Sequence, residues 1–212
     1  MRDSAPARTH CPIRSLVQLF SVAITLAIAG CVSPLQRSVA EQTLRADGGY
    51  RIIPSLAVPA VRGVEGCGAQ ALATVLAYGD ASADSAELAD GLPWHEVGAT
   101  PIDLLLAARD RGREAAIARG SWEALAGHVA RGQPVLIMFD AGPEVQTLTG
   151  RIPTSRVMHW SVVSGVAADG SQVLLAARDA RHHVVERDDF LRRWSKSANC
   201  MIIVTRKGEA GP

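Results

Sequence analysis

The chain of 212 residues is long enough for one ordinary domain and too short for two large ones. Hydrophobic residues make up 48% and charged residues 20%, a globular composition that excludes a largely disordered chain. Because the formal net charge is only +1 and no long basic run occurs, the sequence argues against a nucleic-acid-binding protein. Four cysteines are too few for a disulfide scaffold, so each one is interpreted by itself.

The first thirty residues have the pattern of an export signal. Basic residues come first, and residues 16–29 form an apolar run that is short for a permanent membrane span. The run ends in Ile28-Ala29-Gly30-Cys31, which resembles the lipobox of bacterial lipoproteins, in which the cysteine is acylated and becomes the first residue. This resemblance implies a signal peptide over 1–30 and a lipid anchor at Cys31; the alternative is an ordinary signal peptide with an incidental cysteine.

The residue after the cysteine bears on location. By resemblance to lipoprotein sorting rules, Val32 favours the outer membrane of a two-membrane bacterium, with the domain facing the periplasm. Residues 31–50 are polar and show no clear apolar period, which predicts a lipid-anchored tether. The folded domain is then expected over 51–206, followed by a flexible tail over 207–212.

The domain itself shows helical patterns first and strand patterns after. Helices are expected at 69–78, 85–89, 101–112, 121–130 and 188–195, and extended segments at 52–58, 134–139, 157–167, 172–178, 183–186 and 200–205. Residues 140–156 contain several glycines and prolines and predict a surface loop. This order predicts an α+β domain of two layers, with helices packed on an antiparallel sheet.

A cysteine in the first turn of a buried helix is the most informative feature of the domain. Unpaired backbone N–H groups and the helix dipole at that position favour a thiolate at Cys67, and the flanking glycines let another backbone approach. A thiolate nucleophile needs a base, and His159 at the start of an expected strand is the candidate. Asp179 at the end of the next strand is the candidate to orient the imidazole.

The turn between these two strands decides whether His159 and Asp179 meet. A three-residue loop over 168–170 places the two residues directly opposite on one face of the sheet. A two-residue loop over 169–170 places them on opposite faces instead. The sequence permits both registers.

A family resemblance covers roughly 58–204. Residues 66–78 (GCGAQALATVLAY), preceded by Val58-Pro59, resemble the cysteine-bearing helix of the bacteriocin-processing (double-glycine) peptidases, which are papain-like cysteine peptidases. Residues 158–165 (MHWSVVSG) are similar to the histidine strand of that family, and Asp179 falls where its third catalytic residue would lie. The resemblance implies a papain-like fold and peptide hydrolysis, with Cys67 as nucleophile, His159 as base and then acid, and Asp179 as orienting residue.

One departure from the family bears on activity. Members carry a glutamine shortly before the cysteine that helps to bind the oxyanion, whereas no glutamine lies between Val58 and Cys67 here. Arg62 is a candidate replacement, or the Cys67 backbone N–H acts largely alone. A catalytically inactive lipoprotein that binds peptides or an envelope partner is therefore an alternative, and acyl transfer by the same residues is a third.

The remaining candidates are interpreted structurally. A Cys67–Cys200 disulfide is an alternative that would remove the nucleophile, although Cys200 fits a core position. His182 and His183 adjoin on an expected strand, so their side chains point to opposite faces and do not chelate one ion together. No phosphate loop, zinc spacing or dinucleotide fingerprint occurs, so no metal or cofactor is expected. The sequence leaves the oligomeric state open.

Overall fold

A computed structural model describes residues 31–32, 34–35, 37–54, 56–59, 66–78, 85–93, 98–147, 150–153 and 155–206. The predicted signal peptide over 1–30, the candidate Arg62 and the predicted tail over 207–212 lie outside these residues. Within the described part of the chain, no helix is long and apolar enough to span a membrane.

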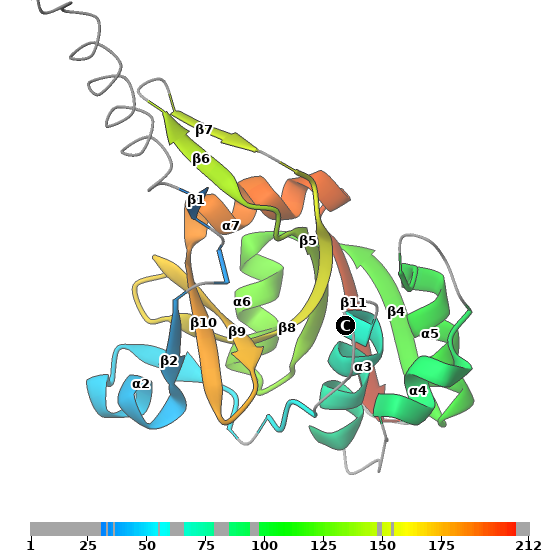
Figure 1. Cartoon of the computed structure of the whole chain (residues 1–212). Helices are drawn as coiled ribbons and strands as arrows, with labels where there is room; N and C mark the ends of the chain where they lie inside the picture. The colour runs from blue at the N-terminus through cyan, green and yellow to red at the C-terminus, as the bar shows by residue number, and fades with distance from the viewer. Residues whose placement is uncertain are drawn as a thin grey trace, which may run out of the picture.

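An eight-stranded antiparallel sheet forms the body of the molecule (Figure 1). Its order is β2-β10-β9-β8-β5-β11-β4, and β3 pairs with β8 off this path. The strands are β2 (Ser38–Ala40), β3 (Tyr50–Ile52), β4 (Arg113–Arg119), β5 (Val135–Asp140), β8 (Met158–Ala167), β9 (Gln172–Ala177), β10 (Arg181–Glu186) and β11 (Cys200–Arg206). A second, three-stranded sheet consists of β1 (Cys31–Val32), β6 (Glu144–Thr147) and β7 (Gly150–Pro153). Figure 1 shows the β6–β7 hairpin projecting away from the body.

The helices are α2 (Glu41–Asp47), α3 (Cys67–Tyr78), α4 (Ser85–Gly91), α5 (Pro101–Asp110), α6 (Trp122–Ala130) and α7 (Arg187–Trp194), followed by the 3₁₀ helix η3 (Ser195–Ser197). Helix α3 packs on β8 and β5, α4 packs on α3, and α5 packs on β4 and β11, whereas α2 lies at the other end of the sheet beside β2 (Figure 1). The predicted mixture of helices and an antiparallel sheet is confirmed.

Helix α3 is buried on most of its sides, as its sequence predicts. Eight of its twelve residues are buried, and small alanine side chains let it pack closely against neighbouring elements. At Gly68 a Cβ atom would lie only 2.9 Å from the Cβ of Ala99, so a glycine is needed for this approach. Close packing therefore fixes the N-terminal end of α3 in the fold.

Local sequence signals place α5 correctly. The Thr100 hydroxyl accepts a hydrogen bond from the backbone N–H of Asp103, and the Asp103 carboxylate accepts one from the Thr100 backbone at 2.8 Å. Pro101 occupies the first helical position, where its missing N–H costs nothing. This capping box confirms the predicted start of the helix.

Three segments differ from the sequence-based prediction. Residues 31–50, predicted as a tether, contain β2 and α2, and because β2 pairs with β10 the folded region begins by Ser38 rather than near Arg51. Residues 140–156, predicted as a loop, contain β6 and β7, which pair with each other. No pattern predicts β4, because this edge strand is rich in alanine and Ala115 is its one buried residue.

The β8–β9 pairing contains both of the registers that the sequence permits. Next to the turn, Val166 pairs with Val173, which is the register of the two-residue loop. A bulge between Val163 and Gly165 then inserts one residue, and Val163 pairs with Leu175 in the other register. The bulge therefore returns β8 to the register in which a continued ladder would place Asp179 opposite His159.

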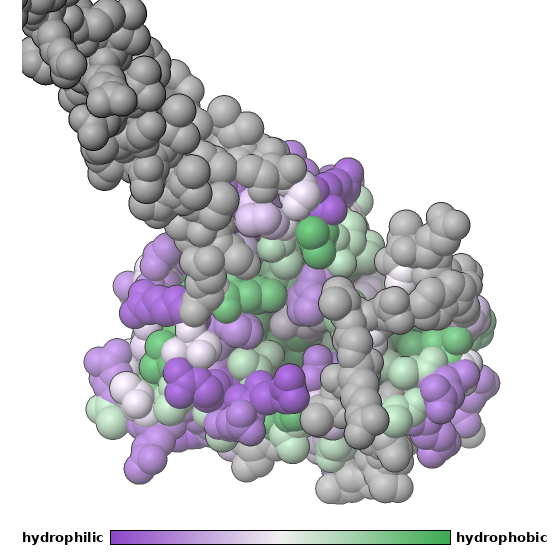
Figure 2. Space-filling view, in the orientation of Figure 1, coloured by the Kyte–Doolittle hydropathy of each residue, from purple (hydrophilic) through white to green (hydrophobic). Residues whose placement is uncertain are grey.

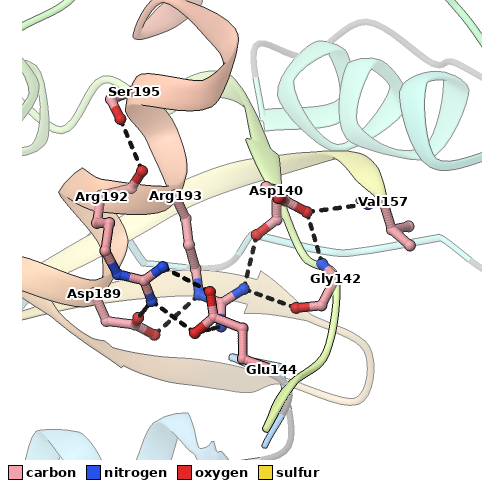
Figure 3. A network of polar contacts seen from close by, with 8 residues as sticks. All are labelled: Asp140, Gly142, Glu144, Val157, Asp189, Arg192, Arg193 and Ser195. Atoms are coloured by element: carbon pink, nitrogen blue, oxygen red, sulfur yellow. Dashed lines mark hydrogen bonds and ion pairs between the residues drawn. The ribbon is translucent and has the colours of Figure 1, made fainter. Parts of the chain in front are cut away.

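A cluster of charged residues fixes the base of the β6–β7 hairpin (Figure 3). Arg193 of α7 is only 2% exposed, and its guanidinium donates to the backbone carbonyls of Asp140 at 3.1 Å and Gly142 at 2.9 Å. It also contacts the carboxylates of Glu144 at 2.9 Å and Asp189 at 3.1 Å. We call Asp140, Gly142, Glu144, Asp189, Arg192 and Arg193 the Arg193 cluster. It joins α7 to the end of β5 and to the first residue of β6.

Candidate active site

The fold brings the first residue of α3 to the beginning of β8. Residues 158–162 of β8 pair with β5 along one edge, whereas β9 pairs with β8 only from Val163 onward. The backbone N–H of Trp160 in β8 donates to the Cys67 sulfur. Trp160 directly follows His159, so the thiol lies at the backbone of the residue next to the predicted histidine, 92 positions further along the chain.

The environment of Cys67 acts on its thiol in two opposite directions. Burial raises the pKa of Cys67 because it removes water from around the thiolate. The backbone N–H groups of Trp160, Gly68 and Cys67 itself lower that pKa, since they donate to the sulfur. Burial is the larger effect, so the net pKa is raised. This net direction contradicts the thiolate that the helix N-terminus alone predicts.

The imidazole of His159 lies against the aromatic ring of its cross-strand partner. Phe139 of β5 pairs with His159, and the two rings meet edge to face with their centroids 6.0 Å apart. Burial lowers the pKa of His159, and the charge of His183 lowers it further. The ring is therefore neutral over a wider pH range than that of a free histidine.

The Cys67 thiol and the His159 imidazole make no direct hydrogen bond. Among the described residues, no hydrogen bond or ion pair joins the sulfur to the imidazole. Because burial raises the pKa of the thiol and lowers that of the imidazole, it favours the uncharged form of both groups.

Asp179 lies in the turn between β9 and β10, beyond the end of the ladder. Strand β9 ends at Ala177, and Asp179 is exposed with a φ of 59°. Within the described part of the chain, neither a hydrogen bond nor an ion pair joins Asp179 to His159. The structure therefore brings Cys67 to the start of the histidine strand but does not show the third predicted residue in contact with the imidazole.

The neighbours of Cys67 are held by hydrogen bonds that the sequence does not reveal. The indole of Trp160 donates to the Ala99 carbonyl at 2.8 Å and is 4% exposed, so it covers the N-terminal end of α3. The Gln70 amide donates to the Pro59 carbonyl at 2.6 Å, which ties the preceding segment to the helix. The Cys67 backbone N–H, at the start of α3, has no carbonyl partner within the helix.

Two further histidines lie near this end of the sheet. His183 acts on His159 through its charge, and its buried Nδ1 has no hydrogen-bond partner among the described residues. His182 lies 2.7 Å through Nδ1 from the Ser164 hydroxyl and 3.3 Å through Nε2 from a Glu41 oxygen. Sequence reasoning separates these adjacent histidines onto two faces, but it does not find their partners, which come from the bulge and from α2.

The alternative of a disulfide is wrong, because Cys67 and Cys200 are both free thiols. Cys200 is half-buried at the start of β11, and burial raises its pKa as well. The thiol of Cys67 is therefore available for chemistry.

Comparison with solved structures finds the same fold in bacterial peptidase domains. A protein described as a C39-like peptidase from Bacillus anthracis matches with a TM-score of 0.54 and 20% identity, over 72% of this chain and 96% of that one. The peptidase domain of Streptococcus ComA, a bi-functional ABC transporter, matches with a TM-score of 0.53 and 18% identity, over 70% and 96%. A double glycine motif protease from an AMS/PCAT transporter, solved in complex with the leader peptide, matches with a TM-score of 0.53 and 19% identity, over 72% and 92%.

These likenesses show the fold: an α+β arrangement of the papain-like peptidase type, with an antiparallel sheet. No protein-family model matches the chain, and no curated protein matches it in sequence. At 18–20% identity, what the chain does depends on its own residues.

Proposed function

We propose that this protein is a cysteine peptidase in which Cys67 is the nucleophile and His159 is the general base. The observation that carries the proposal is the hydrogen bond from the Trp160 backbone to the Cys67 sulfur. It brings a thiol at a helix N-terminus to the strand that carries His159, which supports the thiol–imidazole pairing that thiol hydrolysis needs. Solved peptidase domains with the same fold support this choice of reaction.

The neutral pair defines the order of proton transfers. The sulfur attacks the carbonyl carbon of the scissile bond while His159 accepts the thiol proton, and the Cys67 backbone N–H donates to the oxyanion. The resulting imidazolium gives that proton to the leaving amine as the C–N bond breaks, which leaves a thioester on Cys67. Water, deprotonated by His159, then attacks the thioester and restores the thiol.

We propose a peptide or protein as the substrate. One of the similar structures holds a leader peptide. Figure 2 shows hydrophobic residues in the middle of the drawn face, interspersed with hydrophilic ones. Apolar surface of this kind suits the side chains of an extended peptide.

We also propose that Cys31 carries a lipid anchor, so that the domain faces the periplasm from a bacterial membrane, the outer one by the presence of Val32. The support is the lipobox-like tetrad at 28–31 in the sequence. Residues Cys31 and Val32 pair with Val145 and Glu144 of β6, so the anchor would lie beside the β6–β7 hairpin. Labelling cells with a clickable fatty acid tests this, with incorporation expected in the wild type and lost in Cys31→Ala.

A peptide-binding protein without turnover is the second candidate function. Two observations favour it: the pKa of Cys67 is raised, and the exposed Asp179 lies beyond the end of β9 without a bond to His159 among the described residues. Such a protein would bind peptides in the same place while leaving them intact.

The deciding experiment compares two cysteine variants. A pool of quenched-fluorescence peptides, including ones with two successive glycines, is incubated with the wild type, Cys67→Ser, His159→Ala and Cys200→Ser. We expect Cys67→Ser and His159→Ala to lose at least about 10³-fold in turnover. Cys200→Ser removes the other free thiol and should keep wild-type turnover. Turnover that survives in Cys67→Ser would refute the proposal, and peptide binding without turnover in the wild type would establish the second candidate.

The pH profile tests the neutral pair. His159 must be unprotonated to act as a base, and its lowered pKa extends this condition to more acidic pH. The thiol must keep its proton until attack, and its raised pKa extends that condition to more alkaline pH. We therefore expect kcat/KM to form a broad plateau, with an acid limb below the ordinary histidine pKa and an alkaline limb above the ordinary thiol pKa. Iodoacetamide should label Cys67 only at alkaline pH; rapid labelling in mild acid would show a preformed thiolate instead.

A further inference from the structure

The imidazole of His183 in β10 has a partner for one of its two nitrogens. The ring donates to the backbone carbonyl of Leu35, whereas its buried Nδ1 has no hydrogen-bond partner among the described residues. Nε2 therefore makes the bond to Leu35 and carries the proton of the neutral ring, which leaves an acceptor lone pair on Nδ1. An unpaired acceptor in a buried place costs free energy, which points to a role for this nitrogen.

Cross-strand register places His183 and His159 on one face of the sheet. His183 pairs with Leu175 of β9, and Leu175 pairs with Val163 of β8, so these three side chains share a face. Val163 and His159 share it too, because they are four residues apart on a part of β8 that pairs with β5 without a bulge. Since β9 lies between β8 and β10, the two histidines lie on either side of β9 (Figure 1).

The side chains between the two histidines on this face are small. Ala177 is the last residue of β9, and Ser161 lies two residues beyond His159 in β8. The charge of His183 acts across this gap, since it lowers the pKa of His159 in addition to the larger effect of burial. The two rings are therefore close enough to interact, with little side-chain volume to separate them.

His183 is suited to interact as a neutral acceptor. Burial lowers the pKa of His183, and the charges of His182 and Arg181 lower it further, whereas the Leu35 carbonyl raises it. The net direction is downward, so the neutral ring with its Nδ1 lone pair persists to more acidic pH than in a free histidine. Such an acceptor can take a hydrogen bond from an imidazolium without a buried negative charge.

We propose that His183 positions His159 by accepting at Nδ1 a hydrogen bond from the His159 imidazolium, directly or through one water molecule. This inference rests on the proposed function, in which His159 takes the thiol proton on one of its nitrogens. The N–H on the other nitrogen then donates to His183, so the ring keeps its orientation while it is charged. His183 thus takes the role expected of Asp179, which lies in the exposed turn beyond β9.

Two substitutions of similar shape at His183 test the contact. Asparagine offers an oxygen close to the place of Nδ1, whereas leucine offers no acceptor, and both lack the charge of the histidine. NMR titration of the ring protons measures the pKa of His159, and kcat/KM is measured with the peptide pool on the plateau of the pH profile. We expect the pKa of His159 to be about 0.5–1 higher in His183→Asn than in His183→Leu, and kcat/KM to be about tenfold higher.

His182 provides the matched control, because its side chain lies on the other face of β10. His182→Asn and His182→Leu should therefore give the same pKa of His159 and the same kcat/KM. Equal pKa values in the two His183 variants would overturn the proposal, and so would an equal difference between the two His182 variants.

Two further outcomes are covered by the same experiment. If His183→Leu does not fold, as judged by thermal unfolding, His183→Ala replaces it as the variant without an acceptor. Absence of turnover in the wild type would refute the proposed function, and the NMR titration would still decide whether His183 contacts the His159 imidazolium.

Discussion

The Arg193 cluster and His159 lie next to each other in the fold, but the polar groups of the cluster are fully paired whereas those of Cys67 and His159 are not. Asp140 pairs with Met158 at the end of β5, and the next pair along the same two strands is Phe139 with His159. In the Arg193 cluster, each nitrogen of the buried guanidinium has an oxygen partner (Figure 3). The Cys67 thiol and the His159 imidazole have no acidic partner among the described residues.

This difference separates groups that hold the fold from groups that are free to react. A buried charge is tolerated only when it is paired and hydrogen-bonded, and the Arg193 cluster meets that condition. In the proposed peptidase, the nucleophile and the base instead keep their bonding capacity for the substrate, and burial favours the neutral form of both. The four predictions below test the groups on both sides of this contrast.

The largest effect is expected in the Arg193 cluster. Arg193→Met leaves the carboxylate of Glu144 and the carbonyls of Asp140 and Gly142 without their buried donor, and should lower the free energy of unfolding by about 3–5 kcal/mol. Arg192→Met is the matched control, because Arg192 also binds Glu144 but is exposed, and should cost about 1 kcal/mol or less. Urea denaturation measures both. Equal losses in the two variants would show that burial does not distinguish them.

A smaller loss of stability is expected at Ser164, the residue in the β8 bulge that contacts His182. The Ser164 hydroxyl donates to the backbone carbonyl of Leu174 at 3.1 Å, and the same oxygen lies 2.7 Å from Nδ1 of His182. Ser164→Ala removes that donor inside the sheet and should lower the free energy of unfolding, measured by urea denaturation, by about 1–3 kcal/mol. Ser161→Ala on the same strand should stay within about 0.5 kcal/mol, since the Ser161 side chain makes no hydrogen bond with a described residue. Similar losses of unfolding free energy in the two variants would contradict a stabilising role for Ser164 in the bulge.

The turn after β9 stores a modest strain. Ala180 has a φ of 51°, a left-handed conformation that costs a residue with a Cβ atom. Ala180→Gly should therefore raise the free energy of unfolding by about 0.5–1 kcal/mol. Ala177→Gly in the preceding strand should have the opposite sign and a similar size, because glycine weakens an extended segment. Thermal unfolding checks whether Ala180→Gly stabilises the protein and Ala177→Gly destabilises it.

The smallest effect is expected from Asp179. Because its side chain makes no bond to His159, Asp179→Asn should change kcat/KM by less than about threefold, in contrast to the 10⁴-fold loss typical of an orienting carboxylate. Steady-state kinetics on the peptide pool measure this directly. A loss of several orders of magnitude would show that the turn closes onto His159 when substrate binds.

Sequence patterns predict most elements of the sheet and helices because their signals are local. The capping box at Thr100 and the strand patterns of β5, β8, β9 and β11 need no distant partner to be recognised. Elements that depend on distant partners are missed: α2 and β2 are polar and fold because β10 pairs with β2, and β4 is stabilised by β11.

The candidate site shows the same difference between features set by local sequence and features set by distant residues. The sequence by itself determined which residues have the chemistry, since a cysteine that opens a buried helix and a histidine that opens a strand are local patterns. Only the tertiary structure decided how these groups behave, because desolvation and cross-strand register depend on residues far away in the chain. Burial outweighs the helix N-terminus at Cys67, and the end of β9 leaves Asp179 in an exposed turn.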